Sequence, residues 1–259
     1  MKHSLTFSPQ FYITGNQPCP YKEGFIEKKL FTTLDGSKAQ SLNDSLSQQG
    51  FRRSQNIIYR PNCQKCDSCR SVRIPVEKYQ FSRSDRRILR KNNELVRYEC
   101  APWATEDQFE LFSKYLRNRH YGGGMSEMDN YEFSSMIEES NVSTTVYEYY
   151  HANKLIAVSL TDTMSDGLSM VYSFYDVSMS KSSLGKFMIL DHIELVREAG
   201  LQNLYLGYLV KESRKMKYKR HFSPLEQYYK GNWIPYTDKI ESENDDLSSL
   251  PDNNPISLP

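Results

Sequence analysis

The chain has 259 residues, of which 38% are hydrophobic and 13% aromatic, and its formal net charge is +1. This length is enough for one large or two modest domains. No apolar run approaches the roughly 18 residues that cross a bilayer, and the first residues lack the apolar core of a signal peptide. We therefore expect a cytoplasmic protein in a reducing compartment rather than a membrane or secreted one.

The charge is distributed unevenly along the chain. Residues 52–97 carry thirteen Lys or Arg against four Asp or Glu, whereas residues 238–259 carry six acids against one lysine. The basic segment suits phosphate binding, although a solvated basic face is the plainer explanation. The acidic end is rich in Ser, Asn and Pro, and we expect residues 237–259 to form a disordered tail.

Three cysteines follow one another at two-residue spacing, at Cys63, Cys66 and Cys69. Their thiols can face a common centre, and Cys19 is the candidate for a fourth ligand. Zinc and iron–sulfur sites take four such ligands. The odd count of five cysteines and the tight triple argue against a secreted disulfide framework. The four residues therefore predict a zinc or iron–sulfur site, with packed, reduced thiols as the alternative, and Cys100 is expected to be a small buried apolar residue.

Residues 1–100 are irregular, basic and rich in cysteine, and we expect them to form an N-terminal domain. Short strands are expected at residues 57–59 and 71–76. A helix is expected to begin at Ser84, with its apolar side chains inward and its basic side chains outward. The inward residues are Ile88, Leu89 and Leu95, and the outward residues are Arg86, Arg87, Arg90 and Lys91.

Two further helices are expected in the next segment. The first is started by a capping box, in which Thr105 is followed by Gln108, and the second is shorter and starts at residues 129–132. The glycines at residues 122–124 cannot continue the first helix, because glycine is a poor helix former.

Strands and one long helix are expected after these two helices. The strands are at residues 142–150, 155–163, 169–177 and 204–210. An amphipathic helix is expected between the third and fourth strands, from Ser182 to a terminating glycine at Gly200. Ser223 and Pro224 are expected to cap a final helix.

This order of elements is typical of acyltransferase domains of the GNAT type. We therefore predict the fold class as α/β (α+β), with the cysteine-bearing domain over residues 1–100 and a GNAT-like domain over 101–236. The second domain is expected to have a central, mostly antiparallel sheet. In that architecture the loop before the main helix offers backbone N–H groups to an anionic acyl carrier. The loop here is residues 182–186, although a simple helix cap has the same sequence.

A second basic cluster follows the fourth strand. Residues 211–220 contain six basic residues, and Tyr218 lies among them. Basic side chains with an interleaved aromatic ring can hold phosphates and stack a base. This favours a nucleic-acid contact over a plain solvated charge run, because the cluster lies beside the expected acyl site.

Many spaced motifs of the chain together resemble the bacterial aspartate/glutamate leucyltransferases, which are relatives of the arginyl-tRNA–protein transferases. The resemblance covers roughly residues 1–236, and it departs from the family at Lys22, where an apolar residue is usual. The motifs are residues 19–21 (CPY), 50–61 (GFRRSQNIIYRP), 63–69 (CQKCDSC), 71–75 (SVRIP), 84–87 (SDRR), 172–175 (YSFY), 183–185 (SLG), 205–208 (YLGY), 215–219 (KMKYK) and 222–226 (FSPLE).

The resemblance implies transfer of leucine from leucyl-tRNA to the α-amine of proteins that begin with Asp or Glu, which marks them for N-end-rule degradation. It implies a cytoplasmic enzyme, expected to be a monomer, that needs no ATP and no cofactor for its chemistry. Arginyl-tRNA is the alternative donor. Two further alternatives are an N-acetyltransferase that uses acetyl-CoA and an RNA-binding module with a zinc knuckle.

The chemistry of such a transfer fits mild catalysis. The α-amine that attacks the ester has a pKa near 7.7–8.0, so part of it is neutral at cytosolic pH. Positioning and stabilisation of the oxyanion can therefore suffice without a strong base.

The residues expected to carry the reaction fall into four groups, and His120 and His192 are expected to be structural. Arg53, Arg60 and Arg73 are expected to read the acidic side chain of the acceptor, because guanidinium pairs well with carboxylate. Tyr172, Tyr175 and Tyr208 are expected to line the cleft for leucine and the terminal adenosine, with backbone donors at Ser183 and Gly185. The tRNA is expected to contact Lys215, Lys217, Tyr218 and Lys219 with its acceptor end and Arg86, Arg87, Arg90 and Lys91 with its stem.

Overall fold

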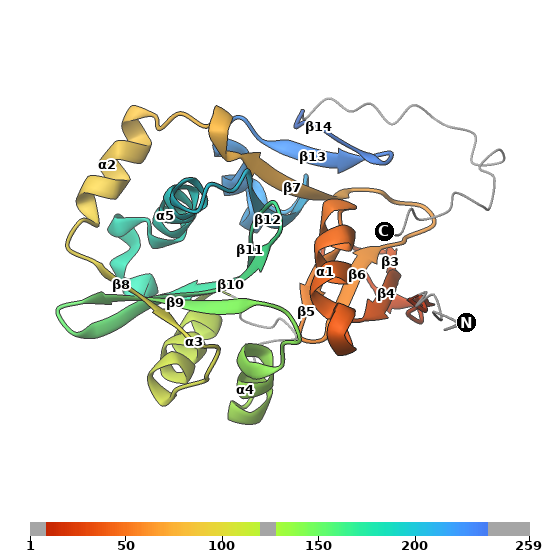
Figure 1. The fold of residues 1–259 in the computed structure, drawn as a ribbon, viewed down its shortest axis with the longest axis horizontal. Coiled ribbons are helices and arrows are strands. Elements are labelled where there is room, and N and C mark those ends of the chain that lie inside the picture. The colour runs from red at the N-terminus through yellow and green to blue at the C-terminus, as the bar shows by residue number, and fades with distance from the viewer. Residues whose placement is uncertain (1–8, 120–127, 238–259) are drawn as a thin grey trace, which may run out of the picture.

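The computed structural model describes residues 9–119 and 128–237. Within these residues the main element is an eight-stranded sheet, in which one neighbouring pair is parallel and the other pairs are antiparallel (Figure 1). This confirms the predicted α+β class with a mostly antiparallel central sheet. The strands in order across the sheet are β14 (Asn232–Pro235), β13 (Glu226–Tyr229), β7 (Cys69–Pro75), β12 (Asn203–Val210), β11 (Gly167–Tyr175), β10 (Lys154–Met164), β9 (Thr144–His151) and β8 (Val96–Cys100).

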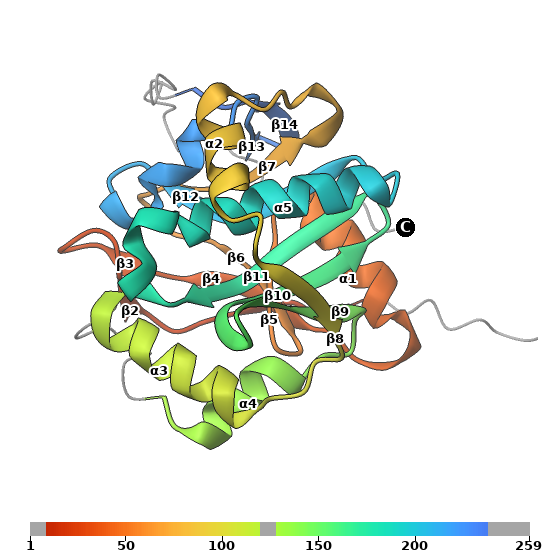
Figure 2. The same cartoon turned by 90° about the vertical axis from the view of Figure 1, so that its left-hand side faces the viewer.

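Helices cover both faces of the large sheet. The helices α5 (Leu184–Glu198) and α2 (Arg83–Lys91) lie on one face, and α3 (Glu106–Arg119) and α4 (Asn130–Glu138) lie on the other (Figures 1 and 2). The element order expected for a GNAT-like domain is present from α3 to β12. A capping box starts α3 as predicted, with Gln108 N–H donating to Thr105 Oγ1. The helix α4 starts where expected and also has a capping box, in which Glu132 N–H donates to Asp129 Oδ1.

A smaller sheet lies beside the large one, at the right in Figure 1, together with α1 (Ala39–Gln48). Among the residues described, it has four strands in the order β1 (Tyr12–Ile13), β4 (Lys29–Thr33), β6 (Ile57–Pro61) and β5 (Arg52–Ser54). A two-stranded ribbon is formed by β2 (Gln17–Pro18) and β3 (Ile26–Glu27). Short 3₁₀ helices are η1 (Gly36–Lys38), η2 (Val76–Lys78), η3 (Val177–Ser182) and η4 (Arg214–His221).

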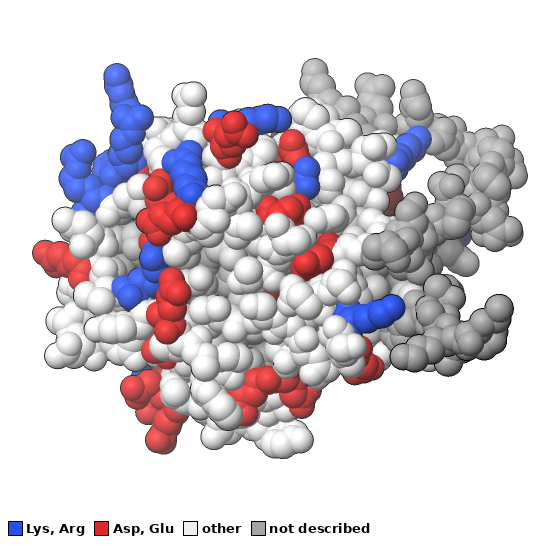
Figure 3. All heavy atoms as spheres, viewed as in Figure 1, with Lys and Arg blue, Asp and Glu red and all other residues white. Residues whose placement is uncertain are grey.

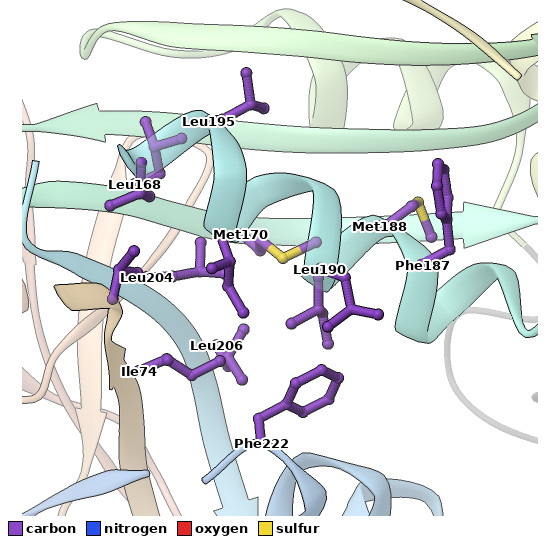
Figure 4. Close-up of a cluster of buried hydrophobic side chains, with 14 of the residues drawn as sticks. Ile74, Leu168, Met170, Phe187, Met188, Leu190, Leu195, Leu204, Leu206 and Phe222 are labelled. Carbon is purple, nitrogen blue, oxygen red and sulfur yellow. The ribbon is translucent and has the colours of Figure 1, made fainter. Parts of the chain in front are cut away.

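The largest buried cluster lies between α5 and the strands beneath it. Met188 and Leu190 of the helix pack toward Leu206 of β12 and Ile74 of β7 (Figure 4). Each fully buried aliphatic side chain of this kind contributes about 1.5–3 kcal/mol to stability. Because β7 belongs to the first hundred residues, the large sheet takes strands from both sides of residue 100, and the division of the chain there stays a prediction.

The end of α5 confirms the predicted glycine stop. Gly200 has a φ of 65°, its N–H donates to the carbonyl of Arg197, and the N–H of Leu201 donates to the carbonyl of Val196. This is the Schellman arrangement, which uses the left-handed conformation that glycine tolerates best.

The helix α2 starts one residue earlier than predicted, at Arg83. Ser82, not Ser84, is the N-cap, because its hydroxyl accepts from the N–H of Asp85 and the Asp85 carboxylate accepts from the N–H of Ser82. The helix also ends earlier than predicted, at Lys91, because the Asn92 side chain bonds to the carbonyls of Ile88 and Ser182.

The final helix predicted from Ser223 and Pro224 is wrong. The segment forms β13, which pairs with β7 on one side and β14 on the other. A Ser-Pro pair starts a turn as readily as a helix, and the edge of β7 offers hydrogen-bond partners that the local sequence does not reveal.

Some predictions fall on residues that the structure does not describe. These are the glycines at residues 122–124, His120 and the acidic tail. Among the described helices, none is long and apolar enough to cross a membrane.

Candidate functional site

A pocket of about 260 Å³ lies where the small sheet meets the large one. Its walls come from segments far apart in the chain, because β6, β7, β12 and β13 all reach it. The residues that line it include all four predicted ligands, Cys19, Cys63, Cys66 and Cys69, together with Gly50, Arg60, Arg70, Tyr208, Tyr228 and Tyr229. The distant Cys19 thus lines the same pocket as the cysteine triple, and that the four residues hold a metal stays a prediction.

The four thiols influence one another. The pKa of Cys69 is raised to about 12, first by burial and then by the other three thiols of the set. Such mutual repulsion between thiolates is what a bound dication relieves. The thiols of Cys63 and Cys66 instead contact the carbonyl of Lys28 at 3.7 Å and the hydroxyl of Ser68 at 3.5 Å. Over residues 9–119 and 128–237, no three donors are arranged to hold a metal ion.

Arginine side chains flank the pocket. The guanidinium of Arg60 lies 4.9 Å from the ring centre of Phe51, and no acid pairs with it in the described part of the chain. Arg70 lies 4.2 Å from the ring centre of Tyr229 and also pairs with Asp67. Of the three arginines expected to bind the acceptor's carboxylate, Arg60 is therefore the one that lines the pocket and has no acidic partner among the described residues.

Arg53 and Arg73, the other two predicted readers of the acceptor, are occupied elsewhere. Arg53 is buried, and its Nε and Nη2 each donate to Asp162 at 2.6 Å. The Nε of Arg73 donates to Glu226 at 2.8 Å, and its guanidinium lies 4.4 Å from the ring centre of Trp233. Neither residue lines the pocket, so their role in reading the acceptor stays a prediction that this geometry does not favour.

Tyr208 joins the two sheets. Its hydroxyl lies within hydrogen-bond distance of two carbonyls of the small sheet's segment, Gly50 at 3.2 Å and Tyr59 at 3.0 Å. Burial raises the pKa of this phenol well above its usual value. Gly50 has a φ of 80°, and a Cβ there would lie 2.7 Å from Tyr228. Tyr208 therefore forms a wall of the cysteine pocket, which Tyr172 and Tyr175 do not line.

The predicted residues Tyr175, Ser183 and Gly185 lie together at the start of α5, whereas Tyr172 packs against Phe112 of α3. A Cβ at Gly185 would lie 3.1 Å from the Tyr175 ring, so glycine lets this ring lie against the helix start. Ser183 has a φ of 54°, and its carbonyl accepts from the N–H groups of residues 186 and 187. Burial raises the pKa of Tyr172 to about 12.

The predicted tRNA-binding residues occupy two surfaces and one interior position. Arg86, Arg87, Arg90 and Lys91 are exposed on α2, where basic side chains gather at the upper left of Figure 3. Lys91 also donates to the carbonyl of Lys181, which ties α2 to the segment before α5. On η4, Lys215, Lys217 and Tyr218 are exposed, whereas Lys219 is buried.

Lys219 therefore departs from the expected surface role. Its Nζ donates to the carbonyls of Leu206 at 2.8 Å and Tyr208 at 2.7 Å. The reason is that η4 packs against β12, so that Lys219 faces the strand while Lys215, Lys217 and Tyr218 face water.

Arg52 is an interior residue that the sequence-based site does not contain. Its Nη2 donates to the carbonyl of Met170 at 2.9 Å, and its guanidinium lies against Gly207. A Cβ at Gly207 would lie 2.5 Å from Arg52 Cζ, and the φ of Gly207 is 81°. A glycine inside a predicted strand is a signal of close approach, and Gly207 could have pointed to such a partner.

The predicted structural role of His192 agrees with its surroundings. The ring is fully buried, with Nε2 2.9 Å from Thr161 Oγ1 and Nδ1 2.7 Å from the carbonyl of Met188. Burial lowers its pKa to about 4, so the ring is neutral near pH 7. Cys100 is only partly buried, and its thiol lies 3.6 Å from Glu148.

Comparisons with known proteins cover nearly the whole chain. A family model described as "Arginine-tRNA-protein transferase, C terminus" matches residues 107–229, and its N-terminal counterpart matches residues 17–87. An "Aspartate/glutamate leucyltransferase" of Ruegeria sp. (strain TM1040) is 53% identical over 255 residues, or 97% of this chain and 93% of that protein. The protein of the same name from Ruegeria pomeroyi is 55% identical over 92% of this chain and 88% of its own length.

Among solved structures, a C-terminal domain described as part of a lysylphosphatidylglycerol synthetase from Agrobacterium fabrum aligns with a TM-score of 0.41 and 9% identity. The alignment covers 60% of this chain and 53% of that domain. The sequence relatives are far more similar, since more than half of their residues are identical to those of this protein. On that similarity, the chain belongs to the aspartate/glutamate leucyltransferases, within the arginine-tRNA-protein transferase family.

Proposed function

We propose that this protein transfers leucine from leucyl-tRNA to the α-amine of proteins that begin with Asp or Glu. The observation that carries the proposal is more than 50% identity to leucyltransferases over most of both chains. The transfer marks the acceptor for N-end-rule degradation. We further propose that the enzyme acts as a monomer in the cytoplasm, where aminoacyl-tRNA is made.

The cysteine pocket is the proposed site for the acceptor's first residue. Arg60 lies at its wall with no acid partner in the described part of the chain, which supports pairing with the acceptor carboxylate. The cavity of about 260 Å³ is small, which suits one amino-acid side chain better than a folded surface. Tyr208 and Tyr228 supply walls with apolar faces.

The donor is proposed to lie along the basic surfaces of α2 and η4. The candidates for the tRNA stem are Arg86, Arg87, Arg90 and Lys91 of α2, and those for its acceptor end are Lys215, Lys217 and Tyr218 of η4. Tyr172, Tyr175 and the backbone at Ser183 and Gly185 are proposed to flank the leucyl ester between these two surfaces.

The reaction is aminolysis of an ester. The α-amine nitrogen forms a bond to the leucyl carbonyl carbon, the bond from that carbon to the ribose oxygen breaks, and the oxygen leaves with a proton. The ester is already activated, so no ATP is consumed. Positioning and stabilisation of the developing oxyanion supply most of the acceleration.

A metal site is proposed at the four cysteines. Four soft thiolate donors that line one cavity suit Zn²⁺ or an iron–sulfur cluster. Bound there, the group would brace the loop between β6 and β7 against Cys19, which shapes the acceptor pocket.

Replacing Cys66 with serine is expected to remove the metal from the purified protein. Elemental analysis after anaerobic purification should give about one zinc, or one cluster, per chain in the wild type and close to none in Cys66→Ser. Cys100→Ser is the matched control, because Cys100 lies beside Glu148 and away from the pocket. Equal metal content in Cys66→Ser and Cys100→Ser would argue against this site.

Neutralising two exposed arginines of α2 is expected to weaken tRNA binding. If Arg87 and Arg90 each neutralise one phosphate, the double variant to glutamine should lower the slope of log K against log salt by about 1.5. The control is a double variant of Lys114 and Lys154 to glutamine, whose lysines are exposed and paired with Glu110 and Asp176. Filter binding at several salt concentrations measures both slopes, and identical slopes would contradict the prediction.

The function is tested by transfer of radiolabelled amino acids to peptides that begin with Asp, Glu, Lys or Ala. Leucyl-tRNA and arginyl-tRNA serve as donors in parallel, with acetyl-CoA as a third. Label from leucyl-tRNA on Asp and Glu peptides alone supports the proposal. Label transferred from arginyl-tRNA or acetyl-CoA would identify that molecule as the donor in place of leucyl-tRNA. Binding of tRNA with no label transferred from any donor would indicate an RNA-binding protein that is not a transferase.

A further inference from the structure

The parallel strands β11 and β12 separate after three paired positions. Their ladder joins Gly167, Leu168 and Ser169 to residues 203–205, and beyond Tyr205 the register of β12 continues only with β7. The edges of β11 and β12 beyond Ser169 and Tyr205 are here called the fork. Main-chain groups along the fork need other hydrogen-bond partners, because unpaired buried polar groups are costly.

Lys219 supplies such a partner on the β12 side. Its Nζ donates to the carbonyls of Leu206 and Tyr208. These two residues flank Gly207, where the ladder with β7 shifts register and where Arg52 lies against the strand. The lysine therefore lies in the fork beside Arg52.

Arg52 enters the fork from the β11 side. It bonds to the carbonyl of Met170 and lies against Gly207 of β12, so it bridges the two strands. Its Nη1 is buried and has no hydrogen-bond partner in the described part of the chain. The fork thus holds two basic side chains from distant parts of the sequence, and no acid forms an ion pair with either of them in residues 9–119 and 128–237.

The contacts of Lys219 suit an uncharged amine. A protonated lysine has three N–H donors, whereas a neutral one has two and a lone pair. Two acceptors hold Nζ, and the described residues provide no third one. Both N–H bonds of the neutral amine are then used, and its lone pair is left in the remaining tetrahedral direction.

Lys219 is linked to the proposed acceptor pocket through Tyr208. Its partner Tyr208 is a wall of that pocket, so one residue contributes both the carbonyl that holds the amine and a surface that faces the acceptor. On the other side, η4 exposes Lys215 and Lys217, which are proposed to hold the donor. Lys219 is thus connected to both proposed substrate sites, to the acceptor site through Tyr208 and to the donor site through η4.

We propose that Lys219 is the proton acceptor of the transfer reaction, an inference that rests on the proposed function. Neutral Lys219 takes one proton from the acceptor's α-ammonium group through one water molecule, because its Nζ does not line the pocket. The freed amine nitrogen forms the bond to the leucyl carbon, and the nitrogen's second proton passes to water. The Lys219 ammonium then gives its proton to the ribose oxygen as the ester bond breaks, which returns the lysine to its neutral form.

The electrostatic surroundings support this role. The pKa of Lys219 is lowered to about 7, first by burial and then by the positive charge of Arg52. Around Arg52 lie the phenols of Tyr59 and Tyr208 and the Arg53–Asp162 pair, in which the acid is already held by its own arginine. The other basic residues of η4, Lys215, Lys217, Arg220 and His221, add no negative charge. A general base is most effective when its pKa lies near the working pH, because it is then largely unprotonated and still binds a proton well.

The test is single-turnover transfer from leucyl-tRNA to a saturating Asp peptide between pH 5.5 and 8.5. In the wild type the rate should rise as pH rises through about 7, because the neutral lysine is the active form. Lys219→Arg keeps a donor that cannot lose its proton, and Lys219→Met removes the amine. Both substitutions should lower the rate by about 10²–10⁴-fold and abolish the rise in rate near pH 7. The affinity of both variants for tRNA should stay within twofold of the wild type.

Lys114→Met is the matched control, because Lys114 is exposed and pairs with Glu110 within α3. It should keep the wild-type rate and profile. A rate for Lys219→Arg within threefold of the wild type, or an unchanged rise in rate with pH, would overturn the proposal. A wild type that transfers no leucine would instead overturn the proposed function.

A second measurement needs no variant at position 219 and decides the matter if both variants unfold. A 3,3-difluoroaspartyl peptide has a less basic α-amine than the aspartyl peptide. If Lys219 causes the rise in rate near pH 7, that rise stays at the same pH with both peptides. A pH–rate profile in which every transition shifts with the pKa of the peptide's α-amine would overturn the proposal.

Discussion

Asp162→Asn is expected to lower the free energy of unfolding by about 3–5 kcal/mol, the usual cost of breaking a buried ion pair from one side. The side chains of Arg53 and Asp162 are 2% and 1% exposed, and two hydrogen bonds of 2.6 Å join them. An asparagine would leave the guanidinium charged and buried without a counter-charge. Urea-induced unfolding of the purified variant measures the change.

This pair has consequences beyond stability because it joins the two sheets. Arg53 lies on β5 and Asp162 on β10, and Arg52 is the next residue along β5. Loosening the pair should therefore also loosen the fork. Glu110→Gln is the control, since its partner Lys114 is equally exposed at 61% and such pairs contribute about 0–1 kcal/mol. A loss in Asp162→Asn no larger than in Glu110→Gln would contradict the prediction.

Arg60→Met is expected to lower kcat/KM for an Asp peptide roughly 10- to 150-fold, which corresponds to about 1.5–3 kcal/mol for a lost hydrogen bond to a charged group. The guanidinium lies at the pocket wall over Phe51, and methionine keeps much of the apolar contact while it removes the charge. Initial rates at several peptide concentrations measure the effect.

The comparison with an Asn peptide makes this prediction specific. If Arg60 reads the carboxylate, the preference of the wild type for Asp over Asn should nearly disappear in the variant. The KM for leucyl-tRNA should stay within twofold, and Arg117→Met, an exposed arginine on α3, should behave as the wild type. A variant that loses activity equally toward both peptides would assign Arg60 a structural role instead.

Local signals in the sequence predicted much of the fold. The capping residues of α3 and α4, the glycine at the end of α5 and the alternating strands act through bonds within a few residues of each other, so a short window contains their cause. The tight cysteine triple is of the same kind. Together they account for the α+β class and for the segment that carries the thiols.

Contacts between distant segments decided the rest. The sequence alone does not tell which of two neighbouring arginines on β5 pairs with Asp162 and which enters the fork, because that depends on the register of two sheets. The strand at β13 exists because the edge of β7 needed a partner, against the local helix signal. Lys219 is buried while Lys217 is exposed, although both belong to one charge run. The sequence by itself thus determined the cysteine motif and the family. The burial of Lys219, and with it the pKa of that lysine, was decided by which chain segments meet in three dimensions.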